Sequence, residues 1–285
     1  MEKHLDTKVV METDNVLVSK QTKFQKLEIV ENKFWGKVMY LDDVLNVAER
    51  DEFVYHEMIV HVPMFIHPDP RRVLIIGGGD GGSAREVLKH PNLEKVVMID
   101  IDGDVVEECR KHMPGVNNGA FEDERLELII GDGIDYVLKA ETSSFDVIIV
   151  DSTDPTPDGC AEVLFTEKFY SNVKRILADN GVMTNMNGLP MRYEQYFLRG
   201  AKVLQRSFSP EHTWFYLVNT DCYNGTMSMG CCFKDGVHPV NGLDVERIKD
   251  FAKQHKLKYY NYKIHNSAFC LPNFVKDHLL FEHCL

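Results

Sequence analysis

The chain has 285 residues, of which 44% are hydrophobic and 27% charged, and its formal net charge is −12. This acidic balance disfavours a nucleic-acid backbone as a partner and favours small cations, although many acidic proteins carry such charge only for solubility. No run approaches the roughly 20 apolar residues of a membrane span, so we expect a soluble protein with neither a membrane nor a nucleic acid as its partner.

The N-terminus and the cysteines bear on the cellular compartment. Residues 1–10 contain charged side chains in place of the apolar stretch of a signal peptide. The seven cysteines have no C-x-x-C spacing, which argues against a zinc ribbon or a dithiol redox motif. We therefore expect a cytoplasmic protein with reduced cysteines.

Residues 1–50 are predicted to form a small antiparallel β domain. Short stretches rich in β-forming residues occur at 15–18, 24–31 and 37–41. The turn sequence at 41–44 favours a hairpin between the last of these stretches and the residues that follow it.

From Asp51 the pattern becomes helical, and we expect the segment 63–70, which begins and ends with proline, to end that helix. Beyond it, short apolar runs alternate with helical stretches, as is typical of parallel β-α-β units. We therefore predict that residues 51–285 form an α/β domain with a doubly wound, Rossmann-like sheet of the class I methyltransferase kind. The apolar runs expected as strands are 73–76, 96–99, 126–130 and 147–150, with helices at 83–90 and 105–113.

A run of glycines, residues 77–82, follows the first of these strands and opens a helix. Gly77, Gly79 and Gly82 satisfy the pattern G-x-G-x-x-G, which several nucleoside-binding folds share. Asp80 inside the turn would repel a phosphate at close range, so it indicates a cationic or neutral ligand. The alternative is a turn that needs glycine only for its own geometry.

Acidic residues also follow the second and third predicted strands, at the edge where such sheets bind ligands. Asp100, roughly 20 residues beyond the glycines, is placed to accept hydrogen bonds from ribose hydroxyls. Asp102 has a competing role as the N-cap of the next helix, and we prefer that interpretation for it. Asp132 and Gly133 lie on the third loop, where a carboxylate can accept from an adenine amino group. A nucleoside ligand is therefore predicted.

Two further carboxylates, Asp151 and Asp154, leave the fourth predicted strand at the same edge. Pro155 disfavours helical geometry at Asp154, so we expect an open loop there. The alternative is that the pair caps the next helix, but Thr166 already supplies a plausible cap. This loop is where a general base is expected.

Together these motifs resemble the spermidine synthase family, the polyamine aminopropyltransferases, over residues 16–274. The segments that carry the resemblance are 49–58, 77–82, 151–155, 258–261 and 265–272.

The resemblance implies an enzyme that transfers an aminopropyl group from decarboxylated S-adenosylmethionine to putrescine, giving spermidine and methylthioadenosine. The sulfonium nucleoside is a co-substrate, and the resemblance implies no cofactor, metal or prosthetic group. The implied partners are therefore a small diamine and the sulfonium nucleoside, together with further copies of the chain in a homodimer or homotetramer.

Carried over position by position, the resemblance implies that Asp151 is the catalytic proton acceptor. The residues implied to bind the donor are Gln25, Gly77, Gly79, Asp80, Asp100, Asp132 and Gly133. The residues implied to bind the amine are Tyr55, His56, Asp80, Asp154 and Tyr223.

Some positions depart from the pattern of the bacterial members. Met186 stands where a glutamine is usual, Asp221 and Cys222 replace the usual residues before the pocket tyrosine, and Asp100 replaces a glutamate. The acceptor therefore stays open among putrescine, cadaverine, agmatine and spermidine, with Asp221 as a candidate to bind a distal ammonium.

Three other functions are compatible with parts of the pattern. A methyltransferase shares the fold, but its donor keeps a carboxylate that Asp80 would repel. A nicotinamide dehydrogenase is opposed by Asp80 and by the β-rich N-terminal region. A polyamine-binding module without activity would keep the acids but would not need a nucleoside site.

The segment His56-Glu-Met-Ile-Val-His61 is similar to a zinc-protease motif, but its histidines lie roughly 140° apart on a helix. We therefore predict no shared metal. His265 is interpreted as a packing or hydrogen-bonding residue, and Tyr259, Tyr260 and Phe269 as core or interface residues.

Overall fold

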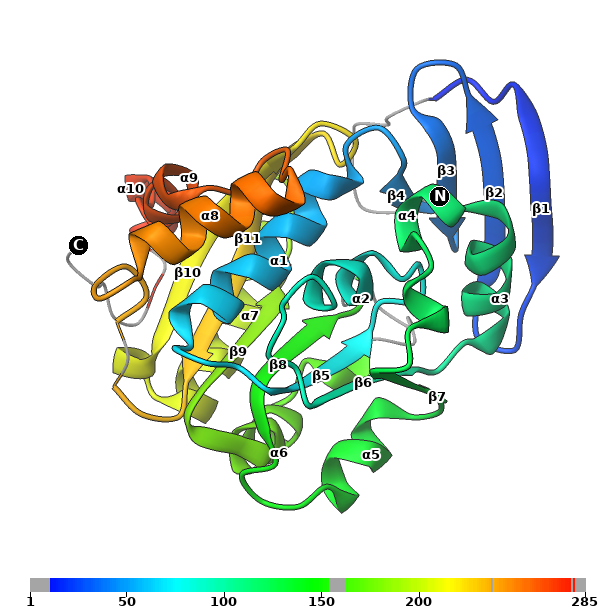
Figure 1. Ribbon diagram of the computed structural model, residues 1–285. Helices are drawn as coiled ribbons and strands as arrows, with labels where there is room; N and C mark the ends of the chain where they lie inside the picture. Colours follow the sequence, from blue (N-terminus) through cyan, green and yellow to red (C-terminus); the bar gives the residue numbers. More distant parts are fainter. Residues whose placement is uncertain (1–10, 154–161, 237, 278, 280–285) are drawn as a thin grey trace.

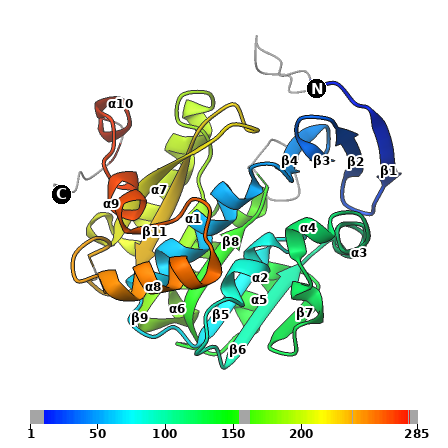
Figure 2. The same ribbon diagram turned by 45° about the horizontal axis from the view of Figure 1, so that its top comes forward.

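The computed structural model describes residues 11–153, 162–236, 238–277 and 279 (Figure 1). These residues form two β-sheets, and most of the helices pack around the larger one. The smaller sheet lies beside α3 (Gly103–His112) and α4 (Pro114–Asn117), at one end of the molecule (Figures 1 and 2).

The small sheet has the order β1-β2-β3-β4, with every neighbouring pair antiparallel. Asp42 and Asp43 have positive φ angles of 49° and 64°, the conformation that a tight two-residue hairpin turn requires. The predicted antiparallel N-terminal region and its turn at 41–44 are confirmed, while the division into domains at residue 50 stays a prediction. The strands are β1 (Asn15–Gln21), β2 (Lys26–Asn32), β3 (Gly36–Leu41) and β4 (Val44–Ala48).

The large sheet has seven strands in the order β10-β11-β9-β8-β5-β6-β7. From β9 to β7 all neighbouring strands are parallel, and β11 and β10 add an antiparallel edge. The four predicted strands are confirmed, and the antiparallel edge was not anticipated. The strands are β5 (Arg72–Gly77), β6 (Lys95–Asp100), β7 (Leu126–Ile130), β8 (Phe145–Asp151), β9 (Leu177–Met186), β10 (Thr213–Thr220) and β11 (Gly225–Phe233).

Both faces of the large sheet are covered, as the doubly wound prediction requires. Ile149 of β8 belongs to the hydrophobic cluster on one face and Ile148 to the cluster on the other, because successive side chains of a strand point to opposite faces. The first cluster includes α1 (Glu52–Ile66), α2 (Gly82–Val87), α8 (Val245–His255) and α9 (Tyr262–Ala268). The second includes α5 (Gly133–Lys139), α6 (Glu167–Ile176), α7 (Glu194–Phe208) and α10 (Asn273–Lys276).

Helix α1 continues through Pro63 to Ile66. Its end lies within the segment 63–70 that was expected to terminate it, but Pro63 itself does not stop the helix. Proline removes one helical hydrogen bond. Nearly every residue of α1 is buried, and tertiary packing of this kind, rather than local propensity, supplies most of the stability of a helix in a protein.

Glu57 ties the C-terminal part of the chain to this central helix. Its carboxylate is 2% exposed and accepts hydrogen bonds from the backbone N–H groups of Lys258, Tyr259 and Tyr260, at 2.7–2.8 Å. A buried carboxylate needs such partners, since burying it without them is costly.

Replacing Glu57 by glutamine is expected to lower the free energy of unfolding by about 2–4 kcal/mol, because the side-chain amide leaves one or more buried N–H groups without an acceptor. Denaturant unfolding measures the effect. Glu246→Gln is the matched control, since Glu246 forms an exposed pair with Lys249 and its loss should cost less than about 1 kcal/mol. Equal stability losses in the two variants would contradict this assignment.

Candidate functional site

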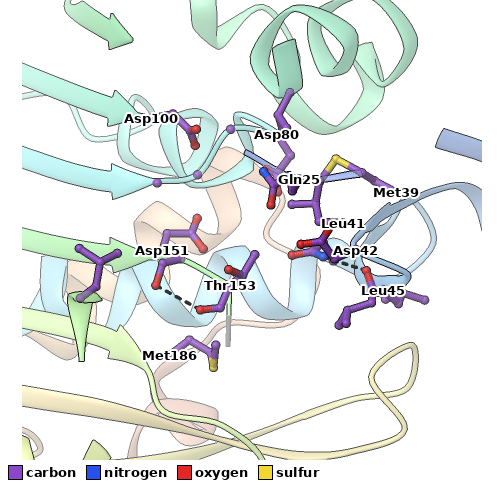
Figure 3. A pocket seen from close by; sticks show the side chains of 18 of the residues that line it. Gln25, Met39, Leu41, Asp42, Leu45, Asp80, Asp100, Asp151, Thr153 and Met186 are labelled. Carbon is purple, nitrogen blue, oxygen red and sulfur yellow. Dashed lines mark hydrogen bonds between the residues drawn. The ribbon is translucent and has the colours of Figure 1, made fainter. Parts of the chain in front are cut away.

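A cavity of about 470 Å³ opens where the large sheet meets the small one. Its lining comes from the carboxyl ends of β5, β6 and β8, from the glycine turn after β5, and from the β3–β4 hairpin. Figure 3 shows Asp100 and Asp151 at the strand ends, with Leu41, Asp42 and Leu45 approaching from the other side. Doubly wound sheets bind ligands at this edge, and the volume suits a small organic molecule.

The glycine turn is required by the close packing of its neighbours. Gly77 has a φ of +86°, and a Cβ atom there would lie 2.0 Å from the carbonyl oxygen of Asp151. A Cβ at Gly79 would lie 2.9 Å from Oδ2 of Asp100. Position 77 therefore requires glycine, and at position 79 an added Cβ would press on the Asp100 carboxylate.

Asp100 lines the cavity at the end of β6, as predicted. Its Oδ1 accepts a hydrogen bond from the Asp102 N–H at 2.8 Å. Burial, together with the charges of Asp102 and other nearby acids, raises the pKa of Asp100 to about 6 in spite of that hydrogen bond. The carboxylate is therefore ionised at neutral pH and able to accept from a ligand's hydroxyl groups.

Asp102 caps α3 by accepting from the Asp104 N–H, which confirms its interpretation as an N-cap. Its other oxygen, Oδ2, accepts from Thr22 Oγ1 at 2.7 Å and from Gln25 Nε2 at 3.1 Å. Gln25 also lines the cavity, and its binding of the donor stays a prediction. The cap of α3 thus fixes the small sheet's side of the cavity to the large sheet.

Asp132 and Gly133 line the cavity as well, at the start of α5. Oδ1 of Asp132 accepts from the Ile134 N–H at 2.8 Å and caps this helix. The side chain is exposed, so its hydrogen bond to an adenine amino group stays a prediction.

Asp151 lies at the end of β8 and faces the cavity between two hydroxyl groups. Tyr55 donates to its Oδ1 and Ser83 to its Oδ2, each at 2.6 Å. Burial and the nearby charge of Asp80 raise the pKa of Asp151, while the charge of His56 and the two hydroxyl donors oppose that rise. The result is a fixed carboxylate of increased basicity.

Ser83 was not predicted as a site residue. Its position was visible in the sequence, because a serine in the first turn of the helix after a glycine run faces the neighbouring strand end. That it reaches Asp151, 68 residues later in the chain, depends on β5 and β8 being neighbours in the sheet.

Asp80 lines the cavity, and its Oδ1 accepts from the Gly82 N–H at 2.7 Å. His56 was expected to contact the amine directly, but it is only 2% exposed and is not among the residues that line the cavity. Its Nε2 lies 3.3 Å from Oδ1 of Asp80. His56 therefore reaches the cavity through Asp80.

Tyr55 and Tyr223 both line the cavity, and their rings meet edge to face with centroids 6.2 Å apart. The Tyr223 hydroxyl donates to the carbonyl oxygen of Asn46, in the small sheet. Met186 extends this wall as a buried, apolar side chain. This part of the cavity therefore combines aromatic rings with apolar surface.

Asp221 is exposed and does not line the cavity, so the hypothesis that it binds a distal ammonium is wrong for this arrangement. The next residue, Cys222, turns inward, and its N–H donates to Asp51 Oδ2 at 2.9 Å. Asp154, the other acid predicted for the amine, lies outside the described residues.

The histidines of α1 have separate partners. His56 contacts Glu52, whereas Nε2 of His61 lies 2.9 Å from Glu86. Among the residues that the structure describes, no group of three or more histidine, cysteine or acidic side chains is arranged to hold a metal ion. His265 bonds to Tyr260 and to a backbone carbonyl group, which confirms its structural role.

In the same described part of the chain, no helix combines the length and the apolar character needed to cross a membrane.

Two family models match the chain. Residues 2–49 match the family described as "Spermidine synthase tetramerisation domain", and residues 52–240 match "Spermine/spermidine synthase domain". The second match alone spans more than half of the chain.

Curated relatives and solved structures agree with these matches. A polyamine aminopropyltransferase of Thermotoga neapolitana is 41% identical over 94% of this chain and 88% of its own length. Polyamine aminopropyltransferase 1 of Pseudomonas aeruginosa is 42% identical over 92% of this chain and 90% of its own. A crystal structure of spermidine synthase in complex with the transition state analogue AdoDATO superposes with a TM-score of 0.88 at 42% identity, covering 94% of this chain and 89% of that one. The chain therefore belongs to the spermine/spermidine synthase family of polyamine aminopropyltransferases.

Proposed function

We propose that this protein transfers the aminopropyl group of decarboxylated S-adenosylmethionine to putrescine, giving spermidine and methylthioadenosine. The observation that carries the proposal is the convergence of Asp80, Asp100 and Asp151 on one cavity. Three carboxylates at one cavity favour cationic or hydrogen-bond-donating ligands, and both proposed substrates are cations. The complex of a related spermidine synthase with a transition state analogue supports this proposal.

The donor end of the cavity suits a nucleoside that carries positive charge. Asp100 lies where this fold binds ribose hydroxyls. Asp80, in the glycine turn, would attract the sulfonium and the ammonium of the aminopropyl arm. Ordinary S-adenosylmethionine carries an additional carboxylate, which Asp80 would repel. This difference favours aminopropyl transfer over methyl transfer.

The acceptor must lose a proton before it attacks, because an alkylammonium has a pKa near 10. In the proposed step, the Asp151 carboxylate takes this proton. The nitrogen lone pair then forms a bond to the carbon next to sulfur, and the carbon–sulfur bond breaks with its electrons returning to sulfur. The sulfonium becomes the neutral thioether of methylthioadenosine, and its positive charge passes to the attacking nitrogen, which becomes the secondary ammonium of spermidine. Charge and atoms therefore balance.

The surroundings of Asp151 fit the role of base. The hydroxyls of Tyr55 and Ser83 hold both carboxylate oxygens, which fixes the direction of proton transfer. The raised pKa of Asp151 brings it nearer to that of the amine, which improves a general base as long as it stays ionised at the working pH. The Tyr55 and Tyr223 rings form a wall along which the methylene chain of the diamine would lie.

The assay that tests the proposal supplies purified protein with decarboxylated S-adenosylmethionine and, separately, putrescine, cadaverine, agmatine and spermidine, with products identified by mass. Putrescine is expected to give the highest kcat/KM, with one methylthioadenosine released per spermidine formed. Preference for another amine would replace the proposed acceptor, and absence of product with all four would contradict aminopropyl transfer.

The control in this assay is Asp151→Asn, which keeps the size of the side chain and removes its basicity. Turnover is expected to fall by at least about a hundredfold, while methylthioadenosine affinity changes little. Turnover similar to that of the wild type would remove Asp151 from the mechanism.

The affinity for methylthioadenosine should decrease as the pH falls through about 6, the raised pKa of Asp100. Protonation removes the negative charge that favours hydrogen bonds from the ribose hydroxyls. Calorimetry across this range measures the effect. In Asp100→Asn the affinity is expected to be lower and nearly independent of pH, and a pH-independent wild-type affinity would contradict the assignment.

A further inference from the structure

His56 lies buried behind the cavity, between two carboxylates. Its Nδ1 is 2.6 Å from Oε2 of Glu52, and its Nε2 is 3.3 Å from Oδ1 of Asp80. Glu52 and His56 are one turn apart on α1, and Asp80 belongs to the glycine turn. The ring therefore connects an acid that lines the cavity to one that is not among the lining residues.

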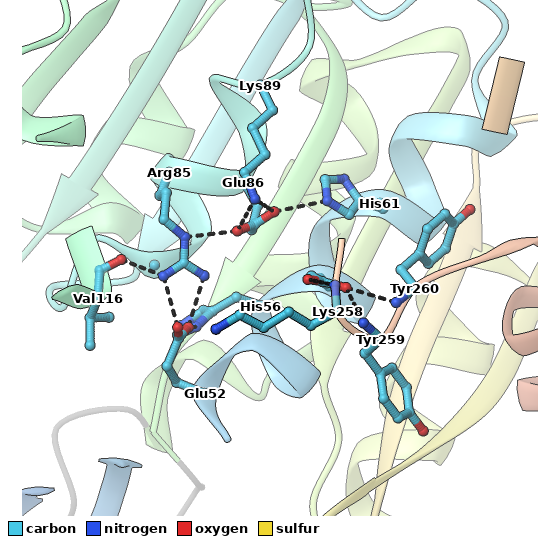
Figure 4. A network of polar contacts seen from close by, with 12 residues as sticks. Glu52, His56, His61, Arg85, Glu86, Lys89, Val116, Lys258, Tyr259 and Tyr260 are labelled. Carbon is cyan, nitrogen blue, oxygen red and sulfur yellow. Dashed lines mark hydrogen bonds and ion pairs between the residues drawn. The ribbon is translucent and has the colours of Figure 1, made fainter. Parts of the chain in front are cut away.

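Glu52 is fixed by a second helix. Arg85 of α2 donates from Nη1 to Oε1 of Glu52 at 2.9 Å and from Nη2 to Oε2 at 2.8 Å. The guanidinium also donates from Nε to Glu86 at 2.7 Å and from Nη1 to the Val116 carbonyl. Figure 4 shows this guanidinium between the two glutamates. The bidentate contact between Arg85 and Glu52 leaves the Glu52 carboxylate little freedom to turn away from His56.

The two contacts determine the protonation state of the ring. A neutral imidazole has one N–H and one lone pair, so it would present its lone pair to one of the two carboxylates. An imidazolium donates to both. Burial opposes the charged form, but the charge of Asp80 and the hydrogen bonds to Asp80 and Glu52 raise the pKa of His56 to about 10. The pKa of Glu52 is held near 2, because its contacts with His56 and Arg85 outweigh its burial.

We propose that Glu52 is a positioning residue that holds His56 as a buried imidazolium, and that this cation orients Asp80 toward the cavity and keeps Asp151 ionised. The role assigned to Asp80 rests on the proposed function. Glu52 itself touches no substrate in this account and acts only through His56.

The charges around the ring explain why the site needs this cation. Asp80 and Asp151 face the same cavity from the glycine turn and from β8, and the charge of Asp80 raises the pKa of Asp151, while that of His56 lowers it. Without the imidazolium, the nearby charge of Asp80 favours protonation of the Asp151 carboxylate. A protonated Asp151 could not accept the proton of the amine. The charge of Arg85, nearest on α2, is matched by Glu52 and Glu86.

The first test follows the histidine ring by NMR with ¹⁵N-labelled histidine, the His56 signals being assigned with His56→Gln. In the wild type, His56 is expected to be doubly protonated at about pH 8, well above the usual pKa of histidine. In Glu52→Gln it is expected to be neutral at the same pH. A neutral His56 in the wild type would overturn the proposal, and this result needs no variant of Glu52.

The second test compares pH profiles of kcat/KM. In Glu52→Gln the acid limb should move upward by about one pH unit, because a neighbouring unit charge shifts a carboxyl pKa by that order. Glu57→Gln is the matched control, since Glu57 lies on the same helix and is also buried but bonds to the backbone of residues 258–260. It should lower stability without moving the profile. An unmoved profile in Glu52→Gln would leave Glu52 a structural residue and overturn the proposal.

A double-mutant cycle separates action through His56 from independent effects. When His56 is already glutamine, adding Glu52→Gln should change kcat/KM by less than about twofold, because coupled residues are not additive. Additive losses would contradict the proposal.

If the protein catalyses no aminopropyl transfer, the NMR titration still decides the state of His56. If it does catalyse the transfer and His56 is neutral, the inference fails and the proposed function stands.

Discussion

The placement of several carboxylates at one buried edge of a sheet is the constraint on which the rest of the site depends. Asp80, Asp100 and Asp151 follow strands that are neighbours in the sheet, so the order of the strands brings these three acids together. Each buried charge is costly unless it has partners. The hydroxyl donors on Asp151, the backbone N–H donors on Asp80 and Asp100, and the His56 ring meet that requirement.

Much of this arrangement could be predicted from the sequence. The alternation of apolar runs and helices gave the parallel strands, and the edge rule for such sheets then located Asp80, Asp100, Asp132 and Asp151. The N-caps at Asp102 and Thr166 were also predicted from residue type and position, and both side chains accept from the expected backbone N–H groups. The helix caps depend on residue type, and the acids of the cavity depend on their position after a strand. Both can be recognised in the sequence.

The parts that could not be predicted depend on contacts between distant segments. Tyr55 and Ser83 come together because both donate hydrogen bonds to Asp151. Glu52 of α1 accepts a hydrogen bond from Arg85 of α2. Asp221 was a candidate for a distal ammonium because of its neighbours in the sequence, but the chain turns Cys222 inward and leaves Asp221 exposed. The spacing of Glu52 and His56, four residues apart on a predicted helix, was a local signal of their contact, although the link to Asp80 required the structure.

The central claim is that the acidic cavity selects a donor whose arm is purely cationic. Calorimetric titration with decarboxylated S-adenosylmethionine and, separately, with S-adenosylmethionine tests it directly, because the two ligands differ only in the carboxylate that would meet Asp80. We expect the decarboxylated compound to bind at least about tenfold more tightly. Equal affinities, or tighter binding of S-adenosylmethionine, would contradict it.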